Sequence, residues 1–190
     1  LEGAPIELQE EGAEDAAVGS IMGGRNFRQF LSAGLAAMPV DADGVRAAVA
    51  SCDPTSFDAW AICFLHAYAN PANEQKAKEV LVSFWPNDYI ELSSEVLPEF
   101  REFERTSTTV INSYVRPVVE RYLTLLTDGL TEMGLTVPLT VMQSNGGLAT
   151  SDIAKERPVY CIESGPAAGV VGAYHLGKHL GISDLMTLDM

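Results

Sequence analysis

Basic residues are scarce in this sequence, which has 12 Lys and Arg against 26 Asp and Glu in 190 residues. The formal net charge is therefore -14 at pH 7. Binding to nucleic acid or to an anionic membrane surface depends on clustered Lys and Arg side chains. The composition argues against both kinds of partner. Any phosphate that the protein holds must be met by backbone amides, a few cations or a metal.

Long hydrophobic runs are also missing, because no uninterrupted apolar stretch approaches the ~18 residues that a membrane-spanning helix needs. The first 20 residues contain six acids and no base, which is the opposite of a secretory signal. We predict that residues 1–26 form an acidic, disordered leader.

The cysteines lack any pairing pattern. Cys52, Cys63 and Cys161 are widely spaced, with no CxxC pair. This pattern indicates structural thiols in a reducing compartment, so we predict a cytoplasmic protein. The three histidines are too scattered to suggest a metal site, and we expect His66 to make a loop hydrogen bond.

The first half of the chain has the pattern of an α/β domain. A continuous apolar run at 59–65 is typical of a strand buried on both faces of a sheet. An amphipathic helix at 72–84 and a short strand at 89–92 follow, which completes a βαβ unit before a loop at 93–98. Asp41 or Asp43 is expected to cap a preceding helix. We predict a mixed sheet with flanking helices.

The longest periodic segment is 106–134, where apolar residues recur every three or four positions. Thr106 or Ser107 is the expected cap and Gly134 the expected end. Pro117 removes one backbone hydrogen bond, so either one long helix is kinked there or two helices meet. The apolar residues at this spacing are Ile111, Tyr114, Val115, Val118, Tyr122, Leu125 or Leu126, and Met133.

A strand at 139–143 is expected to end in the sequence Asn145-Gly146-Gly147. One interpretation is a tight turn with positive φ, for which Asn-Gly is the usual solution. The other is a loop of backbone amides at the end of a strand, where α/β sheets place ligands. The two interpretations are compatible. We also expect a strand at 159–162.

The end of the chain combines small residues with an acid. Glycines and alanines recur at helical spacing between Gly165 and Ala173, so a helix there is suited to close packing against another backbone. Ser164 is the expected cap and Gly181 the expected end. A short strand at 185–188 then leads to Asp189, which either holds Mg²⁺ or caps a turn.

Arg105 lies where we expect a helix to begin, among charged and hydroxyl residues. Capping and solvated charge explain most of this cluster. The alternative is an anion site, because a guanidinium and a helix N-terminus both favour a carboxylate or phosphate.

Four successive blocks of the sequence resemble one family. They are AICFLHAYANPANE, LSSEVLPEFREFERTSTTVINSYVRP, LTVMQSNGGLAT and ESGPAAGVVGAYHLGKHLG with LMTLDM. They are similar to the hydantoinase/oxoprolinase A family, which includes N-methylhydantoinase A subunits, 5-oxoprolinases and subunits of acetone and acetophenone carboxylases. The resemblance covers roughly residues 40–190.

The resemblance implies an actin-like (ribonuclease H-like) ATPase lobe, with 27–190 as part of such a domain. In this family a small-residue helix connects two lobes, and the strand after it delivers an aspartate to a glycine-rich phosphate turn. Asp189 is thereby the candidate catalytic and metal-binding acid. The candidate nucleotide contacts are Gly165, Pro166, Ala167, Ala168 and Gly169, and the candidate substrate contacts are Arg105, Asn145, Gly146 and Gly147.

The resemblance also implies an enzyme that uses ATP and Mg²⁺ to open a cyclic amide such as hydantoin or 5-oxoproline through a phosphorylated intermediate. A B-type subunit or domain is the implied partner. The alternatives are a subunit of an ATP-dependent ketone carboxylase and a non-catalytic scaffold or assembly module. The family's first phosphate loop and its Gly-Gly-Thr-Ser-Thr turn are absent, so we expect an internal fragment that is inactive alone. Asn73 also stands where relatives often have His.

Overall fold

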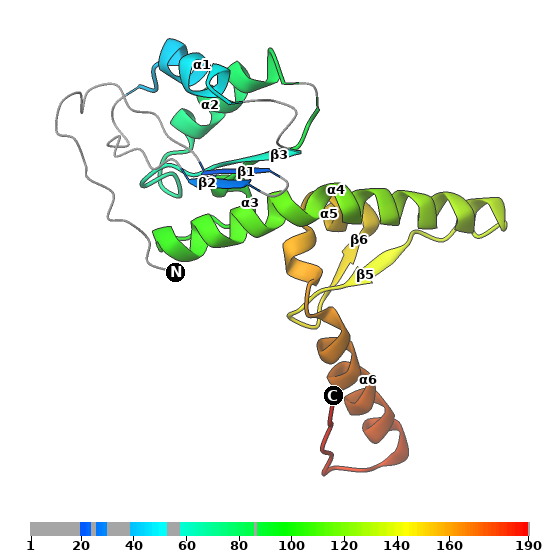
Figure 1. Cartoon of the computed structure of the whole chain (residues 1–190). Coiled ribbons are helices and arrows are strands. Elements are labelled where there is room, and N and C mark those ends of the chain that lie inside the picture. The colour runs from blue at the N-terminus through cyan, green and yellow to red at the C-terminus, as the bar shows by residue number, and fades with distance from the viewer. Residues whose placement is uncertain (1–19, 24–25, 30–38, 53–57, 86, 190) are drawn as a thin grey trace. The chain divides into compact units, whose positions relative to one another are not determined.

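A computed structural model of the chain describes residues 20–23, 26–29, 39–52, 58–85 and 87–189 (Figure 1). The chain divides into two compact units, which comprise residues 1–114 and 115–190. The elements of the first unit are β1 (Ser20–Gly23), β2 (Asn26–Gln29), α1 (Ala42–Ala50), β3 (Ala59–Ile62), α2 (Ala72–Val82), β4 (Ile90–Leu92), α3 (Ser93–Val96) and the first part of α4 (Glu102–Glu132).

The first unit is built on a four-stranded sheet in the order β2-β1-β3-β4. β1 pairs antiparallel with β2 and β3, whereas β3 and β4 are parallel and joined through α2. The βαβ unit, the strand buried on both faces and the mixed sheet are therefore as predicted, and the α/β class is confirmed. β1 lies inside the range 1–26 that we predicted to be a leader, while residues 1–19 lie outside the described residues.

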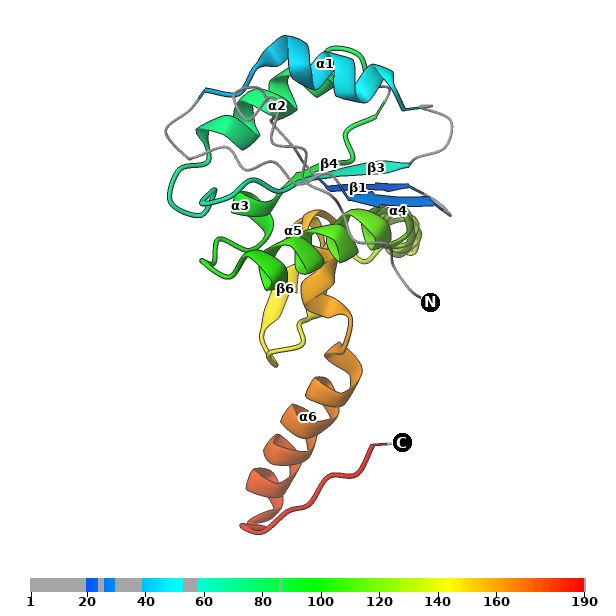
Figure 2. The ribbon, with the colours of Figure 1, turned by 60° about the vertical axis from the view of Figure 1, so that its left-hand side comes forward.

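The two faces of this sheet differ in character. α1 and α2 cover one face, and the first part of α4 covers the other (Figure 2). Trp60 and Ile62 of β3 belong to the apolar core under α1 and α2. Ala61 of β3 is fully buried but does not belong to that core. Glu91 of β4 accepts a hydrogen bond from Asn112 of α4 (3.3 Å). The sheet face toward α4 thus carries small and partly polar side chains.

Local signals explain where these helices begin and end. The carboxylate of Asp41 accepts hydrogen bonds from the N–H groups of Asp43 and Gly44, which caps α1 as predicted. The segment 93–98 was predicted to be loop, but its first four residues form α3. Ser93 and Ser94 are held there by hydrogen bonds to Glu74, which sequence spacing does not reveal.

α4 is one continuous helix with Pro117 inside it. It begins at Glu102, so the predicted cap at Thr106 or Ser107 was wrong, since Glu102 and Glu104 already provide the acids that favour a first turn. Its last residue is Glu132, and the predicted terminator Gly134 follows with a φ of +85°. The N–H of Leu135 donates to the carbonyl of Leu130 (3.0 Å) beyond this left-handed residue.

The second unit contains the rest of α4, a β-hairpin and three further helices in its described part. Its further elements are β5 (Thr140–Met142), β6 (Leu148–Thr150), α5 (Ser151–Glu156), the 3₁₀ helix η2 (Pro158–Cys161) and α6 (Ser164–Leu180). β5 matches the predicted strand at 139–143, whereas the predicted strand at 159–162 is η2. Pro158 explains this difference because proline favours the first turn of a helix and cannot donate to a sheet.

None of the helices in the described ranges combines the length and the apolar composition that crossing a bilayer requires.

Candidate functional site

The sequence Asn145-Gly146-Gly147 forms the turn of the β5–β6 hairpin. The N–H of Gly146 donates to the carbonyl of Gln143 (2.9 Å), and the N–H of Gly147 donates to Oδ1 of Asn145 (2.8 Å). Gly146 has a φ of +82°, a conformation that other residues rarely adopt. The tight-turn interpretation is therefore correct. The N–H groups of Gly146 and Gly147 are used inside the turn, so a ligand there would meet carbonyl groups or side chains.

This turn lies beside the beginning of α6. The N–H and hydroxyl of Ser144 both donate to the carbonyl of Tyr160 (2.7 and 2.8 Å), and the N–H of Glu163 donates to the Ser144 hydroxyl (3.3 Å). A Cβ added at Gly146 would lie 3.2 Å from Cγ2 of Val171 in α6. The structure thus places the turn 145–147 beside residues that flank the candidate segment 165–169 on both sides, Glu163 before it and Val171 after it.

The start of α6 is open. Its N-cap is Glu163, which makes no side-chain cap, so the predicted cap at Ser164 was wrong by one residue. A Cβ added at Gly165 or Gly169 would meet no atom within 4 Å. Within the described residues, the predicted close packing against another backbone is not found. The small residues border open space, next to first-turn N–H groups that have no partner within the helix.

The segment after α6 differs from the prediction. α6 ends at Gly181, with a φ of +71°, as expected. Residues 182–189 form no strand, and Asp189 is exposed. A strand needs a neighbour for its hydrogen bonds, and none is paired with this segment in the described part of the chain. No three His, Cys, Asp or Glu side chains there gather closely enough to hold a metal. Among the described residues, Asp189 is therefore not part of a ready-made group of metal ligands.

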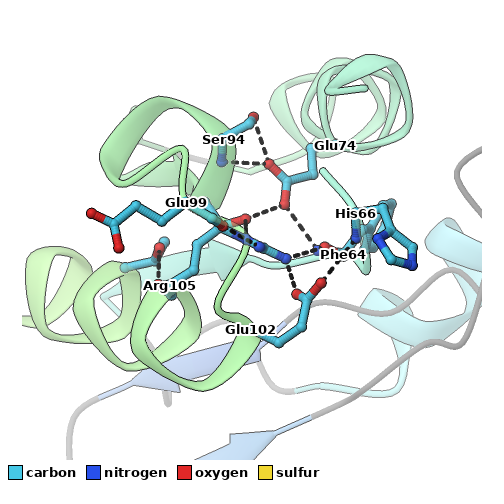
Figure 3. A network of polar contacts seen from close by, with 9 residues as sticks. Phe64, His66, Glu74, Ser94, Glu99, Glu102 and Arg105 are labelled. Carbon is cyan, nitrogen blue, oxygen red and sulfur yellow. Dashed lines mark hydrogen bonds and ion pairs between the residues drawn. The ribbon is translucent and has the colours of Figure 1, made fainter. Parts of the chain in front are cut away.

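Arg105 lies in a buried polar network of the first unit (Figure 3). It has 0% exposure, and its Nε donates to the Ser93 hydroxyl (3.0 Å). Its terminal nitrogens donate to the carbonyls of Glu99 (2.6 Å) and Phe64 (2.8 Å) and pair with the Glu102 carboxylate. The alternative interpretation of this cluster, an anion site at Arg105, does not fit this placement, because the guanidinium is surrounded by groups of the protein itself.

Glu74 is the second buried charge of this network, also with 0% exposure. One carboxylate oxygen accepts from the N–H of Phe64 (2.9 Å) and the hydroxyl of Ser93 (2.5 Å). The other accepts from the N–H and the hydroxyl of Ser94 (2.9 and 2.7 Å). Sequence reasoning missed this residue, because an acid in the first turn of a helix is common and gives no sign of burial. Four donors fill the carboxylate's capacity.

The network fixes the loop that follows β3. Phe64 donates its N–H to Glu74, and its carbonyl accepts from Arg105, so both of its backbone polar groups are engaged. The N–H of His66 donates to Oε1 of Glu102 (3.1 Å), and His66 has a φ of +57°. His66 therefore makes the expected loop hydrogen bond through its backbone. Oδ1 of Asn73 accepts a hydrogen bond from the N–H of Val40 (3.1 Å).

Cys63 borders this network but is not poised as a nucleophile. Burial, followed by the negative charge of Glu74, raises the pKa of its thiol to about 12, although hydrogen bonds with Thr109 and Thr106 and the charge of Arg105 act in the opposite direction. Burial also raises the pKa of Cys161. Because the thiolate is the reactive form, both cysteines fit the structural role that their spacing suggested.

Two family models match the chain. Residues 13–84 match the hydantoinase/oxoprolinase N-terminal region, and residues 105–190 match hydantoinase/oxoprolinase. An uncharacterized protein of Methanocaldococcus jannaschii is 43% identical over 129 residues, which are 68% of this chain and 19% of that protein. The caprolactamase subunit alpha of Pseudomonas jessenii is 35% identical over 169 residues, 89% of this chain and 24% of the relative.

Solved structures agree with these sequence matches. The crystal structure of the ATP-dependent caprolactamase from Pseudomonas jessenii superposes with a TM-score of 0.71 at 35% identity, over 81% of this chain and 22% of that one. A nucleotide-free structure of acetone carboxylase gives a TM-score of 0.67 at 29% identity, over 76% and 21%. The chain thus spans about a quarter or less of these relatives' length. As the four sequence blocks predicted, this chain belongs to the hydantoinase/oxoprolinase family.

Proposed function

We propose that this chain is part of an ATP-dependent enzyme that opens a cyclic amide. The observation that carries the proposal is the similarity, in sequence and in structure, to an ATP-dependent caprolactamase. Caprolactam, hydantoin and 5-oxoproline all contain an amide within a ring, so the family description points to the same chemistry. Since the chain spans only part of these relatives, the activity is proposed for the whole protein.

The nucleotide is proposed to lie at the start of α6. Backbone N–H groups of a first helical turn suit phosphate oxygens, and Gly165 and Gly169 leave space beside them. Asn145 lies in the adjoining turn and is proposed to contact nucleotide or substrate. When bound, ATP supplies a phosphoryl group that makes the amide carbonyl easier to attack.

This chain alone gives less support for a Mg²⁺ site than for a nucleotide site. Asp189 is the proposed ligand, but it is exposed, and the described residues offer no cluster of further ligands around it. In this proposal the remaining ligands, and the cations that balance the phosphates, come from other parts of the enzyme. A B-type subunit is the proposed partner, because the similar caprolactamase chain is itself a subunit.

A ketone carboxylase is the second candidate, favoured by the similarity to acetone carboxylase. Both candidate reactions consume ATP, and the choice between substrates depends on pocket residues that have no sequence motif. A scaffold without catalysis is the third candidate, and it predicts no nucleotide turnover at all.

The test is ATP consumption by the intact protein with its partner subunit, in the presence of caprolactam, hydantoin, 5-oxoproline or acetone. We expect a cyclic amide to stimulate it, and Asp189→Ala to lower the rate about 100-fold or more if the carboxylate holds the metal. Asp184→Ala, in the same exposed segment, is the matched control.

Stimulation by acetone alone would instead establish the carboxylase. Unchanged turnover in Asp189→Ala would remove that residue from the mechanism. Residues 1–190 alone are expected to hydrolyse no ATP, and turnover by them would contradict the view that essential parts of the site lie elsewhere.

A further inference from the structure

The carboxyl ends of two parallel strands meet where the buried network lies. β3 ends at Ile62 and β4 at Leu92, and they run side by side in the same direction. Glu74 ties both exits together, since it accepts from the N–H of Phe64 after β3 and from the N–H of Ser94 after β4. In α/β sheets, ligands bind outside the carboxyl ends of the strands. This edge of the sheet is therefore a place to look for a contact surface.

His66 stands at this edge in a conformation that its surroundings impose. A left-handed backbone is costly for a residue other than glycine and persists where neighbouring groups over-determine it. The N–H of His66 is held by Glu102, and its carbonyl accepts from the N–H groups of Ala69 (3.0 Å) and Asn70 (3.2 Å). The residue is exposed, and its imidazole points away from the network in Figure 3. The fixed backbone thus presents the ring outward.

Tyr68 provides a second ring beside it. The ring centroids of His66 and Tyr68 are 6.2 Å apart, and Tyr68 is 39% exposed. The Arg105 guanidinium lies 5.7 Å from the Tyr68 ring but is itself buried. The two oxygens of Glu102 are engaged by Arg105 and by the His66 N–H. The pair therefore presents an imidazole and a phenol, while the charges behind it are already paired.

We propose that His66 and Tyr68 contact the planar amide of the cyclic substrate. This inference rests on the proposed function. A ring amide carries one N–H donor and one carbonyl acceptor in a plane, and a neutral imidazole and a phenol can each donate and accept. The two rings are tilted by 58° to each other, so a flat ligand can stack on one ring and meet the edge of the other, and no exposed guanidinium is present in this pair and network to favour a carboxylate or phosphate instead.

Carbethoxylation of histidine with diethyl pyrocarbonate tests the contact on the intact protein with its partner subunit. After digestion, mass spectrometry follows His66 separately from His175 and His179, which are exposed on α6. Saturating caprolactam, hydantoin or 5-oxoproline is expected to slow the modification of His66 at least about 5-fold and to leave the other two unchanged. Equal rates at His66 with and without all three amides would overturn the contact.

A substitution at His66 tests the role of the imidazole ring separately from that of the left-handed backbone. Asn tolerates the left-handed conformation, so His66→Asn is expected to keep the melting temperature and to raise KM for the amide at least about 10-fold. Unchanged KM would refute the contact. The proposed function is tested separately by amide-stimulated ATP consumption. Stimulation without protection of His66 overturns only the contact, and protection without stimulation overturns only the reaction. If neither occurs, both proposals are refuted.

Discussion

Replacing Glu74 by Gln tests how much the buried network contributes to stability. The change keeps the shape of the side chain but turns one acceptor oxygen into an NH₂ donor. The hydroxyls of Ser93 and Ser94 can rotate to accept from it, whereas a backbone N–H cannot. Whichever way the amide is oriented, the N–H of Phe64 or of Ser94 therefore loses its acceptor.

The expected magnitude follows from these contacts. A buried donor left without a partner costs about 1–3 kcal/mol. The remaining bonds also lose their charge assistance, which adds roughly 1 kcal/mol. We therefore expect Glu74→Gln to lower the free energy of unfolding by about 2–4 kcal/mol, roughly a 30-fold to 1,000-fold change in the folding equilibrium.

The assay is urea unfolding of the chain followed by tryptophan fluorescence. The sequence has two tryptophans, Trp60 and Trp85, whose rings meet edge to face at 5.0 Å in the unit that contains Glu74. Glu79→Gln on the same helix is the control, because Glu79 is exposed and forms a surface ion pair with Lys76. The control should lie within about 0.5 kcal/mol of the wild type. An equally small effect of Glu74→Gln, with an unchanged slope against urea, would refute the reasoning.

Three further expectations concern glycines and thiols. Gly146→Ala should destabilise the chain by about 1–2 kcal/mol, because the residue has a φ of +82° and the new Cβ would crowd Val171. Gly129→Ala, in open space within α4, should instead stabilise the chain by about 0.5–1 kcal/mol. Equal shifts of the melting temperature in the two variants would contradict this expectation. In the native chain at pH 8, iodoacetamide should label Cys161 before Cys63, and the reverse order would refute the assigned burial. Because the unfolded Cys63 thiol loses its proton near pH 8.5 and the folded one near 12, its contribution to stability should decline across that window. Urea unfolding of Cys63→Ala should show a flatter pH dependence there, and an identical slope would count against the raised pKa.

The sequence predicted the existence of α4 but not which face of this helix is buried. The periodic apolar residues identify a helix, yet most of them are exposed, including Tyr114 at 60% and Val118 at 71%. The buried face carries Thr109 and Ser113, whose hydroxyls donate to carbonyls four residues earlier (2.7 and 3.0 Å). These hydroxyls are satisfied within the helix, so they can pack against the small, polar face of the sheet. The exposed members of this periodic set are Ile111, Tyr114, Val118, Tyr122, Leu125 and Met133.

The candidate site shows the same limit of sequence reasoning. The Asn-Gly turn was predictable because it depends on local chemistry, as was the end of α6 at Gly181. The burial of Arg105 was not, because its acceptors come from positions as far away as Phe64. The expected strand before Asp189 failed for a related reason, since an apolar run becomes a strand only beside a partner.

The arrangement of Glu74 and Arg105 constrains how this protein can change over evolutionary time. Either residue replaced alone leaves donors or acceptors stranded in the interior, and single changes of that kind are costly. Even lysine in place of Arg105 fails, because one ammonium cannot span the acceptors that the guanidinium reaches with three separate nitrogens. A lineage can leave this arrangement only through several coordinated substitutions. We therefore expect substitutions to accumulate on the exposed surface around Glu74 and Arg105, while these two residues stay unchanged.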